Sequence, residues 1–166
     1  MDPKMLQSLY DYHYWARNRV LAAAALLEPD QFTQSKGHSF DTLQGTFVHL
    51  MNSERLWHGR WLQQPAQPPL NPADFPMLDA VRMYWESLEM RLRRFVDQVD
   101  TAQLEDVIRY TNSQGLALQY PLWQMMVQVV MHGVHHRSEA ATMLTEFGHA
   151  PEPLDIIFYY REKSGQ

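Results

Sequence analysis

The sequence predicts an all-α protein: an up-down four-helix bundle with a small β-hairpin before helix four and a short C-terminal helix. Four long stretches repeat apolar residues at three- and four-residue steps, which is the pattern of helices that bury one face. Proline-containing polar segments separate the first three stretches, and the fourth runs for over twenty residues without a breaker. The length of 166 residues suits one domain, so we expect a single domain over residues 1–166.

The first predicted helix covers about residues 2–27, and Pro29 with the polar stretch through Ser39 ends it. The second covers about residues 42–62, where apolar residues recur on one face, and a proline-rich loop follows. These two segments account for the first half of the predicted bundle.

The third helix is predicted to begin near residues 74–76, where proline suits a first helical turn, and to reach residue 99. Two β-prone runs, 106–111 and 116–120, flank the turn residues 112–115 and predict a hairpin. The fourth helix should start at Pro121 and stop at Gly148, and residues 154–161 should form one short helix.

Composition excludes several function classes. The formal net charge is −5 and no run of Lys and Arg stands out, so nucleic acid is not an expected partner. There is no cysteine, so any metal must be held by nitrogen and oxygen ligands. The longest apolar stretch, residues 20–27, is too short to span a bilayer, and the N-terminus does not read as a signal peptide. We therefore expect no membrane association and, by default, a cytoplasmic location.

Histidine spacing carries the main chemical signal. His132 and His136 are four residues apart on a predicted helix, so both imidazoles can reach one ion, whereas His135 falls on a polar arc. An open metal site usually has three protein ligands, and His49, at the flank of the second helix's apolar face, is our third candidate. His58 lies roughly opposite His49 and is expected to be exposed. The alternative is that these histidines are partly buried and satisfied by hydrogen bonds.

The same residues resemble a known family. The run 12–18, Tyr-His-Tyr-Trp-Ala-Arg-Asn, an isolated histidine in helix two and the His-Gly-x-His-His-Arg motif starting at His132 are similar to the DinB/YfiT-like superfamily of metal-binding four-helix bundles. The resemblance covers nearly the whole chain, and it implies that the metal ligands are His49, His132 and His136.

Two further residues are candidates for catalysis, each with an alternative. Similar sequences usually read His-Arg-Gly-Gln where this chain has Glu139 three residues after His136. Glu139 is either an acceptor for an imidazole N–H, a weak fourth ligand or a solvated carboxylate. His13 lies on the apolar stripe of helix one and is either a hydrogen-bonded core histidine or a proton-transfer group facing the metal.

A metal held by three neutral histidines keeps its charge and has open positions, which predicts a metal-dependent enzyme acting on a small molecule. Zn or Ni are the expected divalent ions, with Fe and Mn as alternatives. The reaction is either hydrolysis by metal-bound hydroxide or the transfer of a low-molecular-weight thiol to an electrophile, and resemblance to the thiol-dependent S-transferases of this superfamily favours the thiol. The non-enzymatic alternative is a structural or stress-associated metal-binding bundle.

Two charges fall where charge is costly. Glu54 lies within the apolar arc of helix two and Arg137 within that of helix four, which predicts a direct ion pair across the bundle. Alternatively, Arg137 extends to solvent with its stem buried.

The C-terminal segment 156–160, Ile-Ile-Phe-Tyr-Tyr, is apolar enough to need cover. We therefore expect a homodimer, with packing of this segment on its own bundle as the alternative.

Overall fold

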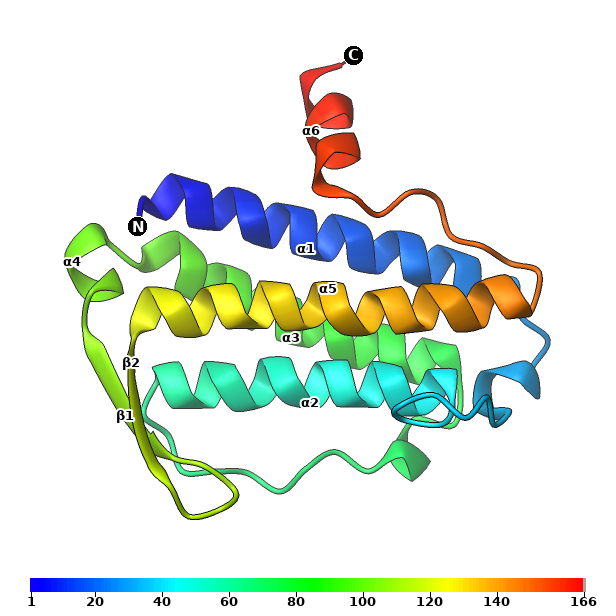
Figure 1. Ribbon diagram of the computed structural model, residues 1–166, viewed down its shortest axis with the longest axis horizontal. Coiled ribbons are helices and arrows are strands. Elements are labelled where there is room, and N and C mark those ends of the chain that lie inside the picture. The colour runs from blue at the N-terminus through cyan, green and yellow to red at the C-terminus, as the bar shows by residue number, and fades with distance from the viewer. Residues whose placement is uncertain (166) are drawn as a thin grey trace.

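The computed structural model describes residues 1–165. It confirms a mostly helical protein with one small two-stranded sheet (Figure 1). The helices and strands are α1 Pro3–Ala24, α2 Leu43–Trp61, α3 Leu78–Gln98, α4 Thr101–Leu104, β1 Val107–Thr111, β2 Ala117–Pro121, α5 Leu122–Glu146 and α6 Ile156–Ser164, with short 3-10 turns at Gln31–Thr33 and Pro72–Asp74. Among the helices of these 165 residues, none is long and apolar enough to cross a membrane.

Local sequence explains where the helices begin. The Asp2 side chain accepts a hydrogen bond from the backbone N–H of Lys4 at the start of α1, where Pro3 suits the first turn. The Thr42 side chain accepts from the N–H of Gly45 at the start of α2. These caps satisfy backbone donors that have no partner within the helix.

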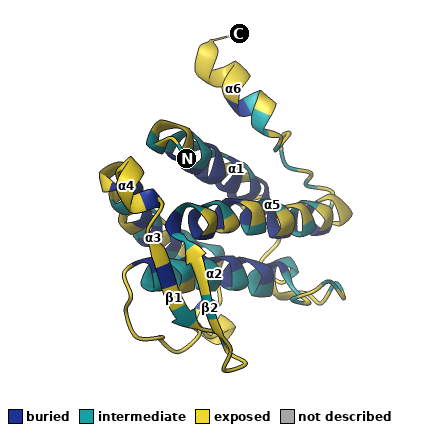
Figure 2. Cartoon of the chain, turned by 60° about the vertical axis from the view of Figure 1, so that its left-hand side comes forward, coloured by how far each residue is buried: buried dark blue, intermediate teal, exposed yellow. Residues whose placement is uncertain are grey.

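The four long helices enclose one core. α1 packs on α3 and α5, and α2 packs on the same two helices. Figure 2 shows the buried residues on the sides of the helices that face one another. The core consists largely of aliphatic and aromatic side chains, and its most deeply buried members include Leu6, Phe47, Trp85, Leu88, Leu92 and Leu144. Burial of this apolar surface is the main stabilising contribution to the fold.

The direction of α3 corrects the predicted up-down order. Residues 62–77 return along α2, where the Asn52 side chain accepts from the N–H of Leu70 and the Gln44 side chain donates to the carbonyl of Phe75. α2 and α3 therefore begin at the same end and run parallel (Figure 1). A 19-residue helix is about 28 Å long, which sixteen residues of extended chain can span. Local sequence patterns locate the helices, but they do not reveal that the loop between α2 and α3 returns along the length of α2.

The predicted hairpin is confirmed. β1 and β2 are antiparallel, with Val107 opposite Pro121 and Thr111 opposite Ala117. In the turn, the Asn112 side chain accepts from two backbone N–H groups, and Gly115 adopts a φ of +78°, which side chains disfavour. The hairpin runs directly into α5.

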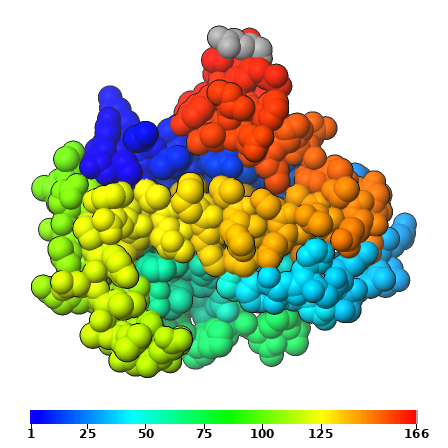
Figure 3. Space-filling view, in the orientation of Figure 1, coloured from blue at the N-terminus to red at the C-terminus, as the bar shows by residue number. Residues whose placement is uncertain are grey.

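α6 packs against the outside of α1 rather than within the core (Figure 3). Tyr159 is buried against Tyr12 and Trp15, and Glu162 accepts a hydrogen bond from the Trp15 indole. The segment therefore packs in part on its own chain. Ile157, on its outer face, remains 65% exposed.

Candidate metal centre

Three histidines from two helices converge on one point between α2 and α5. His49 lies on α2, and His132 and His136 lie one turn apart on α5. The three side chains each offer a ligand nitrogen, and these atoms all lie within 4.8 Å of one another. The Nε2 atoms of His49 and His132 are 2.9 Å apart. The structure thus brings together the three predicted ligands.

The three imidazoles differ in exposure. His136 is buried, whereas His49 and His132 are half-buried. Burial, followed by the neighbouring imidazole of His136, lowers the pKa of His49 to about 4, and the same two causes lower the pKa of His132 to about 4. Both rings are therefore neutral at pH 7 and keep the nitrogen lone pair that a metal requires.

Glu139 fixes the orientation of His136. Its Oε2 atom lies 2.6 Å from Nδ1 of His136, and its Oε1 atom accepts a hydrogen bond from the Ser39 hydroxyl at 2.6 Å. Burial opposes ionisation of Glu139, but the hydrogen bonds from Ser39 and His136 outweigh it and lower the pKa of the carboxyl. If Nδ1 of His136 donates its proton to the carboxylate, the lone pair of the ring is on Nε2, where a metal could bind it.

The loop before α2 contributes residues that sequence analysis missed. Phe40 stacks on His49 with ring centroids 3.8 Å apart and meets His136 edge-on at 5.3 Å. The loop approaches α2 closely, because a Cβ at Gly45 would lie 2.3 Å from the Phe40 carbonyl oxygen. One signal was available: Phe40 is a large apolar residue in a polar segment, two residues before the Thr42 helix cap.

The other two histidines near this region are not part of the triad, although the ring of His135 lies 4.7 Å from that of His136 and, with His136 and Glu139, forms a second group that could hold an ion. The side chain of His135 is 69% exposed and lies 4.0 Å from Glu139, as expected for its polar arc. His58 is half-buried against Trp61 and Phe95, so the expectation that it is exposed was wrong.

His13 is fully buried and joins two charged groups. Its Nε2 atom lies 3.0 Å from Oε1 of Glu54, and Nη1 of Arg137 lies 2.9 Å from its Nδ1. Glu54 and Arg137 therefore do not form the predicted direct pair, because the His13 ring stands between them. Arg137 is 2% exposed, so the alternative in which it extends to solvent is also wrong.

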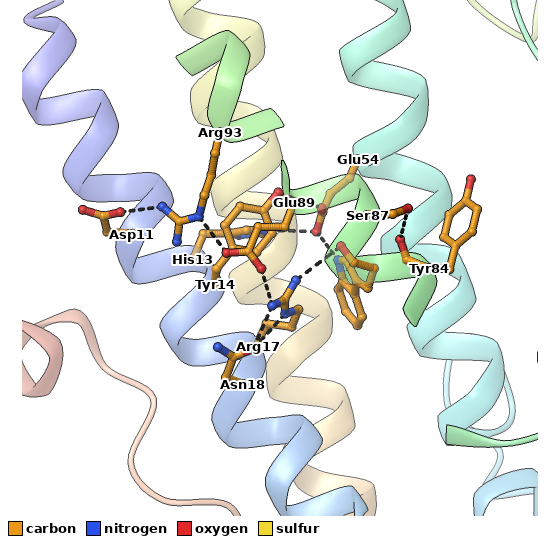
Figure 4. Close-up of polar contacts among 11 residues, drawn as sticks. Asp11, His13, Tyr14, Arg17, Asn18, Glu54, Tyr84, Ser87, Glu89 and Arg93 are labelled. Atoms are coloured by element: carbon orange, nitrogen blue, oxygen red, sulfur yellow. Dashed lines mark hydrogen bonds and ion pairs between the residues drawn. The ribbon is translucent and has the colours of Figure 1, made fainter. Parts of the chain in front are cut away.

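Glu54 is the centre of this buried network, drawn in Figure 4 with its neighbours on α1 and α3. In addition to His13, it accepts hydrogen bonds from the Tyr14 hydroxyl at 3.1 Å and the Trp85 indole at 2.8 Å. Burial raises the pKa of Glu54, but these donors and nearby positive charge outweigh it, so the carboxyl pKa is lowered. Burial and then Arg137 lower the pKa of His13, which is therefore neutral. We name Glu54, His13 and Arg137 the buried bridge.

The donor set of the triad suits a transition-metal ion. Two nitrogens bound to one tetrahedral zinc ion are about 3.3 Å apart, close to the 2.9 Å between Nε2 of His49 and His132. Within residues 1–165 this cluster has three members, and both oxygens of the adjacent Glu139 are engaged elsewhere. An ion bound by the three imidazoles would keep positions open to a small molecule.

Comparison with known proteins supplies independent evidence on the family and the fold of the chain. The sequence profile described as the DinB family matches residues 1–165. The chain is 22% identical over 158 residues to Protein DinB of Bacillus subtilis strain 168, covering 91% of each chain. A crystal structure of a DinB-like protein of B. subtilis, YjoA, superposes with a TM-score of 0.63 at 14% identity, covering 87% of this chain and 95% of the other. At that identity the structural likeness concerns the fold alone.

Proposed function

Because the chain belongs to the DinB family, we propose that it is a metal-dependent enzyme that acts on a small molecule through an ion held by His49, His132 and His136. The convergence of three imidazoles, with those of His49 and His132 held neutral, is the observation that carries this proposal. Zn or Ni are the proposed ions, since imidazole ligands suit both. The ion supplies a positive charge that favours the anionic form of a bound water or thiol.

The number of ligands favours catalysis over a structural role. Structural zinc sites are usually closed by four protein ligands, whereas catalytic sites keep one position open. The described cluster offers three ligands, and Glu139 is held by Ser39 and His136. A structural or stress-associated metal-binding protein is the alternative, and a fourth protein ligand in a metal-loaded structure would favour it.

The surroundings of Glu139 favour thiol transfer over hydrolysis. Hydrolysis benefits from a carboxylate or imidazole that can accept a proton from water, but both oxygens of Glu139 already accept hydrogen bonds. A thiol loses its proton near pH 8.5 without help, so a positive charge alone is enough to hold it as thiolate at neutral pH. The sulfur then forms a bond to an electrophilic carbon, the leaving group departs with its electron pair, and the thiol proton goes to solvent.

The predicted four-helix bundle is part of this proposal, and the mutual packing of the four long helices supports it. In it, α2 and α5 hold the ligands, and Glu139 with Phe40 orients two of the imidazoles. His49 and His132 are only half-buried, so a small substrate could reach an ion bound there.

The test begins with metal content. Protein dialysed after loading with zinc or nickel should retain about one equivalent, whereas His49→Ala, His132→Ala and His136→Ala should each retain almost none. His135→Ala is the matched control on α5 and should bind as wild type. Retention of a full equivalent by His49→Ala would overturn the three-histidine site.

Activity is tested on the zinc- or nickel-loaded protein. Cysteine and glutathione, each with 1-chloro-2,4-dinitrobenzene, probe thiol transfer by release of chloride and formation of the thioether. A nitrophenyl ester without thiol probes hydrolysis. We expect thiol-dependent turnover that His132→Ala lacks and His135→Ala retains. Equal rates for loaded wild type and His132→Ala in both assays, across a series of thiols, would contradict an enzymatic role.

A further inference from the structure

The two helices that carry the proposed metal ligands are also joined behind the site. Glu54 lies on α2, five residues after His49, and Arg137 directly follows His136 on α5. His13 of α1 hydrogen-bonds to both, at 3.0 Å and 2.9 Å. The buried bridge is therefore a polar connection between the ligand-bearing segments of α2 and α5, made through a third helix.

The bridge has a defined direction of hydrogen bonding. A guanidinium only donates, so Nδ1 of His13 must accept from Arg137 and carries no proton. Nε2 of the neutral ring then carries the proton and donates to the Glu54 carboxylate. One tautomer satisfies both partners, and all three side chains are buried, so the bridge holds its ends at a set separation.

Gly133 brings this bridge against the metal-binding turn. It directly follows His132, and a Cβ placed on it would lie 2.4 Å from Cε1 of His13 and 2.5 Å from Nη1 of Arg137. Real Cβ atoms are not found at such distances from other heavy atoms. The backbone of α5 at Gly133, directly after His132, therefore approaches the His13 ring with no side chain between them.

We propose that His13 is a positioning residue, which sets the separation of α2 and α5 and thereby the spacing of His49 from His132 and His136. This inference rests on the proposed metal centre and deepens it. At the triad itself, the spacing depends on contacts between the imidazoles and on the Phe40 ring, which touches both His49 and His136. The bridge adds a buried, hydrogen-bonded connection between the same two helices, so it raises affinity for an ion whose ligand spacing it matches.

The variants separate hydrogen bonding from bulk. His13→Leu removes both hydrogen bonds and leaves Glu54 and Arg137 without their shared partner. His13→Gln keeps one acceptor and one donor at similar reach, and is the conservative rescue. Gly133→Ala keeps the bridge residues but adds a methyl group where they touch α5. Leu92→Ala, a fully buried residue of α3, is the control for lost core packing.

The readouts are the dissociation constant for Co²⁺, measured by competition with a chelator, and the d–d absorption bands that report ligand geometry. All proteins are measured well below their unfolding temperatures. We expect His13→Leu and Gly133→Ala to bind Co²⁺ at least tenfold more weakly with altered bands. His13→Gln should stay within about threefold of wild type with unchanged bands, and Leu92→Ala should match wild type.

The proposal is overturned if folded His13→Leu binds Co²⁺ within twofold of wild type with the same spectrum, or if Leu92→Ala weakens binding as much. Should His13→Leu not fold, the comparison of Gly133→Ala with Leu92→Ala replaces it. The same limits on Co²⁺ affinity and spectrum then apply to Gly133→Ala. A metal-free arm separates this inference from the proposed function. Nuclear Overhauser contacts between the His49 and His132 rings should be present in wild type and lost in the variants that disturb the bridge. If wild type binds no metal but shows ring contacts that the variants lose, the proposed function fails and the positioning role of His13 stands. If the variants keep these contacts, the positioning role is overturned.

Discussion

The protein contains two polar clusters that differ in how their hydrogen-bonding groups are satisfied. In the buried bridge, every atom that joins Glu54, His13 and Arg137 meets a complementary donor or acceptor. In the triad, the Nε2 atoms of His49 and His132 face each other, and a metal would need the lone pair of both. The contacts that join the first cluster are made without any added group, although Nη2 of Arg137 is buried with no hydrogen-bond partner. The second cluster needs an added group to use both lone pairs.

The difference teaches how to separate structure from function among histidines. His13 and His136 are both buried, so burial alone does not distinguish them. Their partners do: His13 has a donor on one nitrogen and an acceptor on the other, whereas His136 has Glu139 at Nδ1 and its ring lies beside two other imidazoles. A surplus of acceptors around one point is the feature of a metal site.

The largest expected effect comes from breaking the bridge. Glu54→Gln removes the only buried acidic side chain of residues 1–165 and leaves Arg137 without a compensating negative charge. Leaving a buried charge uncompensated costs about 3–5 kcal/mol. Urea denaturation of the metal-free protein measures it, with the exposed Glu152→Gln as control. A loss below about 1 kcal/mol would show that the bridge matters little to stability.

The triad, unlike the bridge, should contribute to stability only when a metal is bound. Zinc at one hundred times its dissociation constant should raise the free energy of unfolding of wild type by about 2.7 kcal/mol. His132→Ala should gain nothing, because a ligand is lost, while His135→Ala should gain as much as wild type. Thermal or urea unfolding with and without zinc gives the values. Equal gains for His132→Ala and wild type would remove the triad from the binding site.

A smaller effect is expected at Glu139, which orients His136 without belonging to the triad. Glu139→Gln keeps the shape but loses the charge that accepts the His136 proton, and such changes lower metal affinity about 10- to 100-fold. Competition with a chelator measures the change. Glu146→Gln, on the same helix and paired with Lys36, is the control and should leave affinity unchanged.

The last effect concerns pH and the metal-free protein, and it is small near neutral pH. His49 and His132 have a folded pKa of about 4, below the ordinary 6.5, so between these values the unfolded chain binds protons that the folded protein does not. Stability should therefore fall as the pH drops from 6.5 towards 4, by at most about 1.4 kcal/mol per pH unit for each proton. His49→Ala should make this dependence shallower. An unchanged slope would mean that these rings are protonated in the folded state.

Much of this architecture could be predicted from local sequence. Helical spacing located α1, α2, α3 and α5 to within a few residues, and turn residues located the hairpin. The four-residue step from His132 to His136, with the polar arc of His135, selected the pair that the structure brings together with His49. These features depend on positions within one element, which is why the sequence alone reveals them.

Features that depend on the relative placement of two elements were harder to predict from the sequence. A helical wheel indicates that Glu54 and Arg137 face inwards, but not that α1 places His13 between them. Likewise, nothing periodic marks Ser39 and Phe40, because loops have no repeating face. The short helix α4 was missed although Asp100 and Gln103 form a capping box, a signal that the sequence does contain.

The distance along the chain between the ligands has a consequence for folding order. His49 and His132 are 83 residues apart, and the crossing segment 62–77 and the hairpin lie between them. Closing so long a loop is entropically costly, so contacts between α2 and α5 are expected to form late. An ion held there would tie the two helices together like a reversible cross-link. It would slow unfolding while leaving the folding rate nearly unchanged. A bound ion would therefore mark a chain that has completed its fold.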